Sequence, residues 1–213
     1  AQLALCLGRR GEFAEAHALV DQVIARAPTA GLGPRARAQL AWWQGEHDVA
    51  DKALRAALHA DIDVPVAIDM LVNVAHTDAA RRDAIAYVRE ELRRQVSDGS
   101  GLAAYRLAAA HIDSPGEILS VLEEYRENRP ELLAGWIEVI RQRAAMRHLE
   151  EAREHAAEAV RCFPLQANAH FILAEMLGEG PIDEARRAEQ IAALEAAVAL
   201  APGAAPPRIA LAE

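Results

Sequence analysis

The chain has 213 residues, a formal net charge of −9 and only three Trp, three Tyr and three Phe. The excess of acidic residues argues against a nucleic-acid-binding protein, because such proteins need a basic face to displace counterions from phosphates. Alanine, leucine, glutamate and arginine are abundant and favour long helices, whereas residues that favour strands are scarce. A basic partner, or a local basic pocket, is compatible with this balance.

The two cysteines, Cys6 and Cys162, belong neither to a CxxC pair nor to a Cys/His cluster. We therefore expect no disulfide framework and no structural zinc site, and we interpret both as small buried residues. No apolar run approaches the roughly 18 residues that a membrane-spanning helix requires.

The start of the sequence lacks the charged and apolar segments of a secretory signal peptide. Ala1 stands where a complete chain would begin with Met, and the residues around it have a helical pattern, so we expect a fragment of a longer protein. A cytoplasmic location is favoured, and a periplasmic one would require a signal peptide upstream of Ala1.

The first predicted element is a helical hairpin between Leu3 and Pro28, with apolar residues at helical spacing on both sides of a turn. Gly11 lies in the turn, where glycine adopts a positive φ at little cost. Ala16 is small enough for the two helices to approach closely. Pro28 has no amide hydrogen and cannot extend the second helix.

Residues of this hairpin recur downstream at an interval of 34 residues. Gly11 is repeated by Gly45; Ala16 by Ala50, Ala84 and Ala152; and Pro28 by Pro130 and Pro164. Periods of this length mark repeat architectures, in which each hairpin buries its apolar faces against its neighbours.

The predicted fold is all-α, with about six helical hairpins and a terminal helix in a single domain. The repeats are approximately 1–29, 30–63, 64–97, 98–131, 132–165 and 166–203, followed by a partial repeat at 204–213. Repeat four is the most divergent, since Ile118 replaces the small alanine, although Ser114 and Pro115 still predict the start of a helix. Repeat six carries four extra residues, which we place in the turn at 178–181.

These residues resemble the tetratricopeptide repeat family over essentially the whole chain. The family motif has a tryptophan-like residue early in the first helix, as at Trp136, and a glycine and an aromatic around the turn, as at Gly11 and Phe13. Its alanine and proline are matched by Ala16 and Pro28. The resemblance implies a right-handed α-solenoid of antiparallel helix pairs. Its concave groove, lined by first helices, would bind a peptide or a partner helix.

In this register the candidate groove residues lie on the first helices of the repeats. They are Arg35, Gln39, Trp42, Asp69, Asn73, His76, Leu107, His111, Arg141, Asn168, Phe171 and Glu175. Asn73 is the most suggestive of them, because an inward amide could clamp a peptide backbone. For each polar residue alone, a solvated surface position is the alternative interpretation.

Some members of the family hold the C-terminal carboxylate of chaperones with lysine, asparagine and arginine on successive first helices. Arg35, Gln39 and Asn73 partly imitate that arrangement. Ala103 and Leu107 occupy positions where basic residues would be needed, so we do not predict chaperone binding.

Trp42 and Trp43 are adjacent on a predicted helix and point about 100° apart. We expect one of them to pack between hairpins and leave open whether the other is a groove anchor. The sequence does not tell which of the two is exposed. Trp136 is expected to pack in the core.

No catalytic residue, metal site or cofactor is predicted. The sequence contains neither HExxH nor a Glu-x-x-His motif, and no Ser, Cys or His arrangement identifies a nucleophile. His148 and His155 are interpreted as members of a solvated helix face. The stretch from Arg81 to Arg94 is interpreted as an exposed helix with ion pairs between spaced charges.

The leading functional hypothesis is a non-catalytic scaffold that binds a peptide or a partner protein in the concave groove. One alternative is a helical, substrate-presenting domain of a larger bacterial enzyme of the glycosyltransferase or sulfotransferase type. Another is a scaffold for envelope secretion or polysaccharide export. Self-association is also plausible, because an array open at both ends exposes apolar helix faces.

Overall fold

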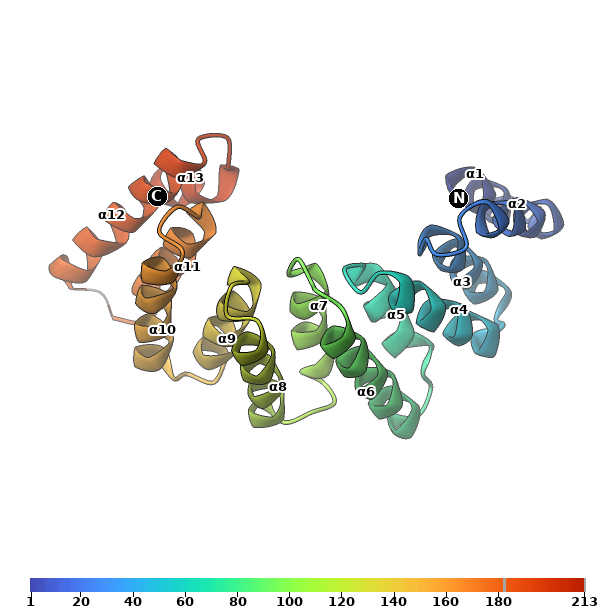
Figure 1. Ribbon diagram of the computed structural model, residues 1–213, viewed down its shortest axis with the longest axis horizontal. Coiled ribbons are helices and arrows are strands. Elements are labelled where there is room, and N and C mark those ends of the chain that lie inside the picture. The colour runs from blue at the N-terminus through green and yellow to red at the C-terminus, as the bar shows by residue number, and fades with distance from the viewer. Residues whose placement is uncertain (182, 213) are drawn as a thin grey trace. The chain divides into compact units, whose positions relative to one another are not determined.

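The computed structural model describes residues 1–181 and 183–212 (Figure 1). Thirteen helices, α1 to α13, follow one another over these residues, and no strand occurs among them. The all-α helical repeat fold predicted from the sequence is therefore confirmed. None of the helices in this described part of the chain is long and apolar enough to cross a bilayer.

The helices belong to two compact units, an N-terminal unit of residues 1–114 and a C-terminal unit of residues 115–213. The boundary divides the predicted fourth hairpin, since α7 belongs to the N-terminal unit and α8 to the C-terminal unit. The predicted single domain ends at residue 213, which lies outside the described residues. One array across both units stays a prediction, so each unit is described by itself.

The N-terminal unit contains three hairpins and the helix that follows them. Its helices are α1 (Gln2–Arg9), α2 (Phe13–Arg26), α3 (Leu32–Gln44), α4 (His47–Ala60), α5 (Pro65–Val74), α6 (Asp78–Arg94) and α7 (Ser100–Ala109). The two helices of each hairpin pack on each other, and each second helix packs on the first helix of the next hairpin. Two pairs of first helices, α1 with α3 and α5 with α7, are also in contact. Neighbour-to-neighbour stacking of this kind is expected of a repeat array.

The C-terminal unit continues the same alternation of first and second helices. Its helices are α8 (Pro115–Asn128), α9 (Leu133–Ala145), α10 (Leu149–Cys162), α11 (Ala167–Gly178), α12 (Glu184–Leu200) and α13 (Ala205–Ala212). The first helices α9 and α11 contact each other, and α13 packs on α12 as the predicted terminal helix.

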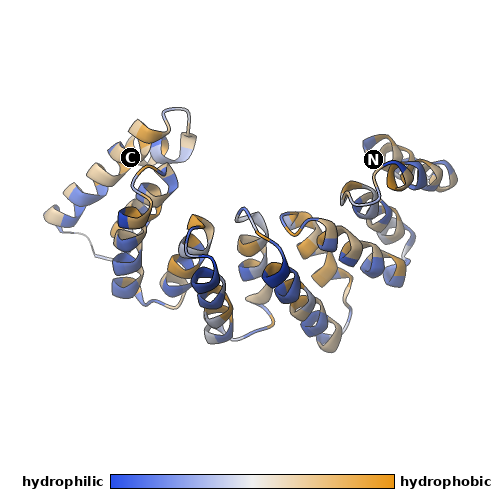
Figure 2. Ribbon diagram, in the orientation of Figure 1, coloured by the Kyte–Doolittle hydropathy of each residue, from blue (hydrophilic) through white to orange (hydrophobic). Residues whose placement is uncertain are grey.

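Alanines lie where the helices of the N-terminal unit approach most closely. Ala16, Ala50 and Ala84, which recur at the 34-residue interval, are each fully buried. Val20 of the first hairpin and Leu40 of α3 pack in the same cluster as Ala16, because the methyl side chain leaves space for larger neighbours. In the N-terminal unit, hydrophilic residues are most concentrated on α6 (Figure 2).

The core of the C-terminal unit is built around Trp136. Its ring lies edge-on to Phe163 with centroids 6.2 Å apart, and its indole nitrogen donates to the carbonyl oxygen of Pro130 at 3.1 Å. Only 9% of Trp136 is exposed. The prediction that Trp136 packs in the core is therefore confirmed.

Three hairpin turns place a residue with positive φ at the same repeat position. Gly11 and Gly45 have φ of 84° and 75°, and Arg147 has φ of 65°. Glycine avoids the steric cost that a side chain carries in this left-handed region, so Arg147 is a strained substitute. In repeat three the turn lies at 75–77, and Ala79, which the register places at the glycine position, is already part of α6.

The departure of repeat four lies where the sequence predicts it, whereas that of repeat six lies only partly there. The second helix of repeat four, α8, begins at Pro115 and buries Ile118 at 1% exposure. In repeat six α11 ends at Gly178 and α12 begins at Glu184. Their connection is longer than the 146–148 turn of repeat five, but α12 also has 17 residues where α10 has 14, so the extra residues fall partly beside the predicted turn and largely in the second helix.

Two interpretations of exposure are wrong. Cys6 and Cys162 are both exposed rather than buried. His155 is half-buried on α10, where burial first, and then the charges of Arg143 and Arg126, lower its pKa. A small or polar residue on an amphipathic helix does not by itself reveal which flank faces a neighbouring helix.

The helix α6 carries the predicted ion pairs, but one of its carboxylates is buried. Arg81 pairs with Asp78, and Arg93 pairs with Glu90. Glu91 is only 5% exposed and lies 2.9 Å from the Nδ1 atom of His59 on α4. Burial raises the pKa of Glu91, yet its hydrogen bonds, first that with His59, outweigh burial and leave the pKa below its usual value. This carboxylate therefore helps to hold α6 on α4.

Candidate peptide-binding groove

The candidate groove is formed by the first helices of the N-terminal unit. Residues one repeat apart occupy equivalent positions on α3, α5 and α7, because each helix follows the same turn and packs on the same neighbours. The equivalent sets are Leu32, Val66 and Ser100; Arg35, Asp69 and Ala103; and Gln39, Asn73 and Leu107. A single surface is thus assembled from residues that are distant in the sequence.

A cleft of about 730 Å³, here called the α5/α7 cleft, lies along these two first helices. It brings together four of the predicted groove residues, Asp69, Asn73, Leu107 and His111. Two large apolar side chains remain open to solvent at its margin, Val66 at 60% exposure and Leu107 at 61%. An apolar cleft with a few polar groups is the usual character of a binding site.

Small residues on α7 create the volume of the cleft. Ala103, Ala104 and Ala108 line it from α7, whereas Val66, Val72 and Asp69 line it from α5. The alanine side chains leave space that larger residues at these positions would fill. The sequence register places Ala103 at a groove position but predicts no cleft at these alanines, because repeat four departs most from the motif.

A second cleft, of about 620 Å³, adjoins the first at the start of α5. Pro65 and Val66 line both clefts, and Arg35 and Leu32 line the second from α3. Asp61 and Asp63, from the connection between α4 and α5, complete its rim. Arg35 therefore lines a cleft that adjoins the one lined by Asp69 and Asn73.

Asp63 fixes the start of α7 and with it one wall of the α5/α7 cleft. Its carboxylate accepts hydrogen bonds from the hydroxyl of Ser97 at 2.5 Å and from the amides of Asp98 and Gly101 at 2.6 and 2.8 Å. Ser97 is fully buried. These bonds satisfy amides at the helix N-terminus, which have no partner within the helix.

Gly101 allows α7 to approach the preceding connection closely. A Cβ atom at this position would lie 2.6 Å from the carbonyl oxygen of Ile62, which is too near for any side chain. The glycine therefore permits the close approach that the Asp63 hydrogen bonds require.

The far end of α7 is held on α6 by Arg89. The Nε atom of Arg89 donates to the hydroxyl of Tyr105 at 3.0 Å, and its guanidinium pairs with Asp113. Tyr105 is fully buried, and burial raises the pKa of its hydroxyl, which therefore stays protonated. Both ends of α7 are thus fixed, so the cleft is formed before any ligand binds.

The two adjacent tryptophans of α3 face different partners. Trp43 packs against the core cluster of the first hairpin, and Arg9 lies 5.8 Å from its ring. Trp42 lies edge-on to His47, with ring centroids 5.7 Å apart, and His47 lies edge-on to His76 at 4.2 Å. Both tryptophans are half-buried. Packing between hairpins is confirmed for Trp43, and Trp42 joins the predicted groove residue His76 through His47, which the sequence interpretation missed.

In the C-terminal unit, the equivalent wall is formed by α9 and α11. Arg141 lies 3.4 Å from both Glu138 and Glu175, so its charge is paired within the wall. Phe171 packs against the cluster of Ala174, Ala193 and Leu194, and Asn168 is exposed. Three of the four predicted groove residues of this unit, Arg141, Phe171 and Glu175, thus contact one another or the core.

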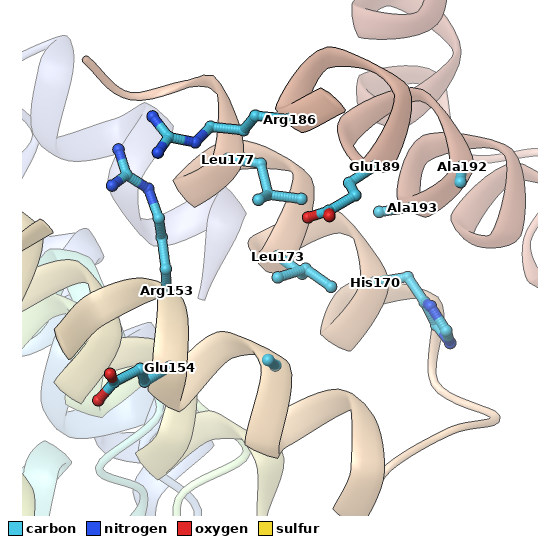
Figure 3. A pocket seen from close by; sticks show the side chains of 10 residues that line it. Arg153, Glu154, His170, Leu173, Leu177, Arg186, Glu189, Ala192 and Ala193 are labelled. Carbon is cyan, nitrogen blue, oxygen red and sulfur yellow. The ribbon is translucent and has the colours of Figure 1, made fainter. Parts of the chain in front are cut away.

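The C-terminal unit also has a cavity of about 590 Å³ beside its second helices (Figure 3). Leu173 and Leu177 of α11 form its apolar floor, while Arg153 of α10 and Arg186 of α12 approach each other at one end. The Nε atom of Arg153 donates to the carbonyl oxygen of Met176 at 3.1 Å. No residue of this cavity was predicted from the sequence to bind a ligand.

The described residues contain no group of three or more His, Cys, Asp or Glu side chains placed to hold a metal ion. The geometry that stands out is an apolar cleft with an amide, a carboxylate and an imidazole at its edge. Such an arrangement can bind a peptide by burying apolar side chains and pairing with backbone groups.

Comparison with known proteins gives matches of structure only. No known family and no curated protein matches the sequence. A solved structure of PilW, a type IV pilus biogenesis factor, is 18% identical, covers 99% of this chain and 96% of its own, and has a TM-score of 0.49. The TPR protein YrrB, described with an unusual peptide-binding site, is 16% identical, with coverages of 91% and 98% and a TM-score of 0.48.

The chain is a helical repeat protein. Another similar structure is TTC0263, a TPR protein of Thermus thermophilus, at 16% identity, coverages of 99% and 94% and a TM-score of 0.44. At these identities and scores the likeness concerns the helical repeat alone. The similarity to tetratricopeptide repeat proteins rests on the hairpins and the 34-residue interval of this chain itself.

Proposed function

We propose that the chain is a protein-interaction scaffold that binds an extended peptide, or an extended segment of a partner protein, along the first helices of its N-terminal unit. The α5/α7 cleft carries this proposal, because it gathers Asp69, Asn73 and His111 beside exposed Val66 and Leu107. Neither of the two alternative functions, substrate presentation and envelope export, is favoured by a described feature.

Binding at the cleft would be driven by burial of apolar surface. Val66 and Leu107 expose more than half of their surface, and covering apolar area contributes about 25 cal/mol per Å². The alanines of α7 leave room for a bulky side chain of the peptide. Because α7 is fixed at both ends, little conformational entropy is lost when a ligand enters.

Asn73 would fix the orientation of a bound peptide as well as add to the affinity of its binding. Its side-chain amide both donates and accepts, so it can pair with an N–H and a C=O of one peptide unit. Asn73 is exposed on α5, seven residues after Val66, and therefore lies two turns along nearly the same helix face. An extended peptide that contacts both would lie along α5.

The test is a substitution that fills the cleft. Ala103→Trp places an indole against α5, whereas Ala86→Trp adds the same ring on the exposed face of α6, outside either cleft. The probe is a fluorescent pool of peptides of about ten residues with Leu, Ile or Phe at the centre, and the readout is anisotropy. We expect Ala103→Trp to weaken binding by about tenfold or more, and Ala86→Trp to leave it within about twofold.

Equal binding by both variants would overturn the proposal, as would a pool that does not bind the unsubstituted chain. Circular dichroism of both variants confirms that the helices are intact, so that loss of binding is assigned to the filled cleft.

A further inference from the structure

We infer that the groove of the N-terminal unit selects a basic peptide, with a bulky apolar residue in the α5/α7 cleft and a lysine or arginine beside it. This inference rests on the proposed function and names the chemistry of the partner.

Three carboxylates line the two adjoining clefts. Asp69 lies in the α5/α7 cleft, and Asp61 and Asp63 lie in the second cleft. Asp63 accepts hydrogen bonds only from neutral donors, and Asp61 accepts one from the amide of Asp63 at 2.9 Å. Throughout the described ranges, these three carboxylates form no ion pair, so no cation of the chain neutralises their negative charge.

The cations of the same surface do not balance this charge. Arg81 lines the α5/α7 cleft, but it pairs with Asp78 at 3.4 Å and donates to the carbonyl oxygen of Ala75 at 3.1 Å. Arg35 lines the second cleft and has no ion-pair partner among the described residues. Among the described residues of this surface, three carboxylates and one arginine, Arg35, form no ion pair, so the net charge of the surface is negative.

Asp69 lies where it would pair with a basic residue of the peptide, next to the apolar residue bound in the α5/α7 cleft. Asp69 follows Val66 by three residues and precedes Asn73 by four, so all three lie along one face of α5. An apolar side chain between Val66 and the alanines of α7 would bring the neighbouring residues of a peptide to Asp69. A lysine or arginine at that point would pair with a carboxylate that is otherwise unpartnered.

The charge of the whole chain acts in the same direction. A net charge of −9 attracts a basic peptide and repels an acidic one, which raises the rate of encounter at low salt. An acidic peptide would have only Arg35 to pair with, at the end of the groove away from the α5/α7 cleft.

The experiment compares four fluorescent peptide pools of about ten residues. Three share a central Leu, Ile or Phe and carry Lys, Glu or Ser on both sides, and the fourth carries Lys around a central Ser. We expect the apolar Lys pool to bind about tenfold more tightly than the apolar Glu pool, and raising NaCl from about 0.05 M to about 0.5 M to remove most of the difference. The Lys pool without an apolar centre should bind weakly.

The matched variants separate local charge from total charge. Asp61→Asn combined with Asp69→Asn should weaken binding of the apolar Lys pool by about fivefold or more relative to binding of the Ser pool, and circular dichroism shows that the variant is folded. Asp48→Asn removes a charge from an exposed position on α4, outside either cleft. It should change binding of the Lys pool by less than about twofold.

A Glu pool that binds as tightly as the Lys pool, or a double variant that keeps the Lys preference, would overturn this inference. The proposed function would stand in that case if Ala103→Trp still abolished binding. If Ala103→Trp left every pool bound, the proposed function itself would fail. If the Lys pool without an apolar centre bound as tightly as the apolar one, the role of the cleft would be overturned.

Discussion

The two units build the same wall from first helices, but they use its charges differently. In the N-terminal unit Arg35 and Asp69 face open clefts without ion-pair partners among the described residues. In the C-terminal unit Arg141 and Glu175, one repeat apart, pair with each other. Arg141 and Glu175 stand at the repeat position of Gln39 and Asn73, about one helical turn beyond that of Arg35 and Asp69, so within the described ranges the first helices carry paired charges in one unit and charges without ion pairs in the other.

The difference arises from the size of the neighbouring side chains. The position of Ala103 in the N-terminal unit corresponds to Ile137 and Phe171 in the C-terminal unit, and both of these pack against core clusters. Small residues leave a cleft, whereas large ones fill it and bring the adjacent helices' charges into contact. A cleft between first helices can thus be present in one repeat and absent from another without a change of fold.

The largest expected effect concerns the close packing of the start of α7 on the connection between α4 and α5. Gly101→Ala would place a Cβ atom 2.6 Å from the backbone oxygen of Ile62, which cannot move without disturbing the Asp63 hydrogen bonds. We expect a loss of about 2–3 kcal/mol in the free energy of unfolding, measured by urea denaturation.

The matched control is Gly135→Ala at the equivalent position on α9. Its Cβ atom would lie 3.1 Å from Cα of Arg126, so a small shift suffices, and the gain in helix propensity offsets part of the cost. We expect a change within about 1 kcal/mol of zero. Equal losses in both variants would show that α7 is not specially constrained.

The second prediction compares the stability effects of removing Arg141, which forms ion pairs, and Arg35, which forms none among the described residues. Arg141→Ala leaves Glu138, which is only 3% exposed, with one ion-pair partner fewer, so we expect a loss of about 1–2 kcal/mol in stability. Arg35→Ala removes no ion pair and should change stability by less than about 0.5 kcal/mol. Thermal and urea denaturation of both variants measure this difference. A larger loss for Arg35→Ala would contradict the assignment of Arg35 to the open surface.

The smallest predicted effect is the response of the C-terminal unit to acid. Burial of His155, followed by the charges of Arg143 and Arg126, lowers its pKa below the ordinary 6.5, although Glu158 and Glu123 act in the opposite direction. Between that lowered value and 6.5 the unfolded chain binds a proton that the folded chain does not. The stabilising contribution is therefore present above 6.5 and is lost as the pH falls through the folded pKa.

The measurement is the melting temperature of the wild type and of His155→Gln between about pH 7.5 and about pH 5. The free energy of unfolding of the wild type should fall by about a few tenths of a kcal/mol more than that of the variant. The effect is small because solvent screens a half-buried histidine. Parallel pH profiles would show that His155 does not contribute to acid sensitivity. Glu91, whose pKa is also lowered, affects stability only when the pH falls towards and below its ordinary 4.5.

The helical repeat could be predicted because its signals are local and recur. Gly11, Ala16 and Pro28 have short-range steric reasons for their positions, and the same reasons apply at each 34-residue interval. The packing of Trp136 follows from the same register. Even Arg147, which lacks the glycine signal, adopts the left-handed conformation that its position in the turn requires.

The candidate groove could be predicted only in part. The register placed Asp69, Asn73 and His111 on one surface, since equivalent positions on neighbouring first helices are adjacent. It could not show that Arg141 is paired, because the pairing depends on how far apart two side chains from different helices lie. The cleft itself depends on alanines in repeat four, where the motif is weakest and gives no indication of which small residues leave space.

Asp63 also bears on whether the repeats are interchangeable. Its carboxylate joins the end of one hairpin to Ser97, Asp98 and Gly101, so the acceptor and its donors are supplied by successive modules. A recombinant array that transplants Asp63 with the third hairpin but without the start of α7 would carry an acceptor that lacks the amides of Asp98 and Gly101. Exchange of modules in this chain should therefore succeed when the cut falls inside a hairpin and preserves this junction, rather than between hairpins.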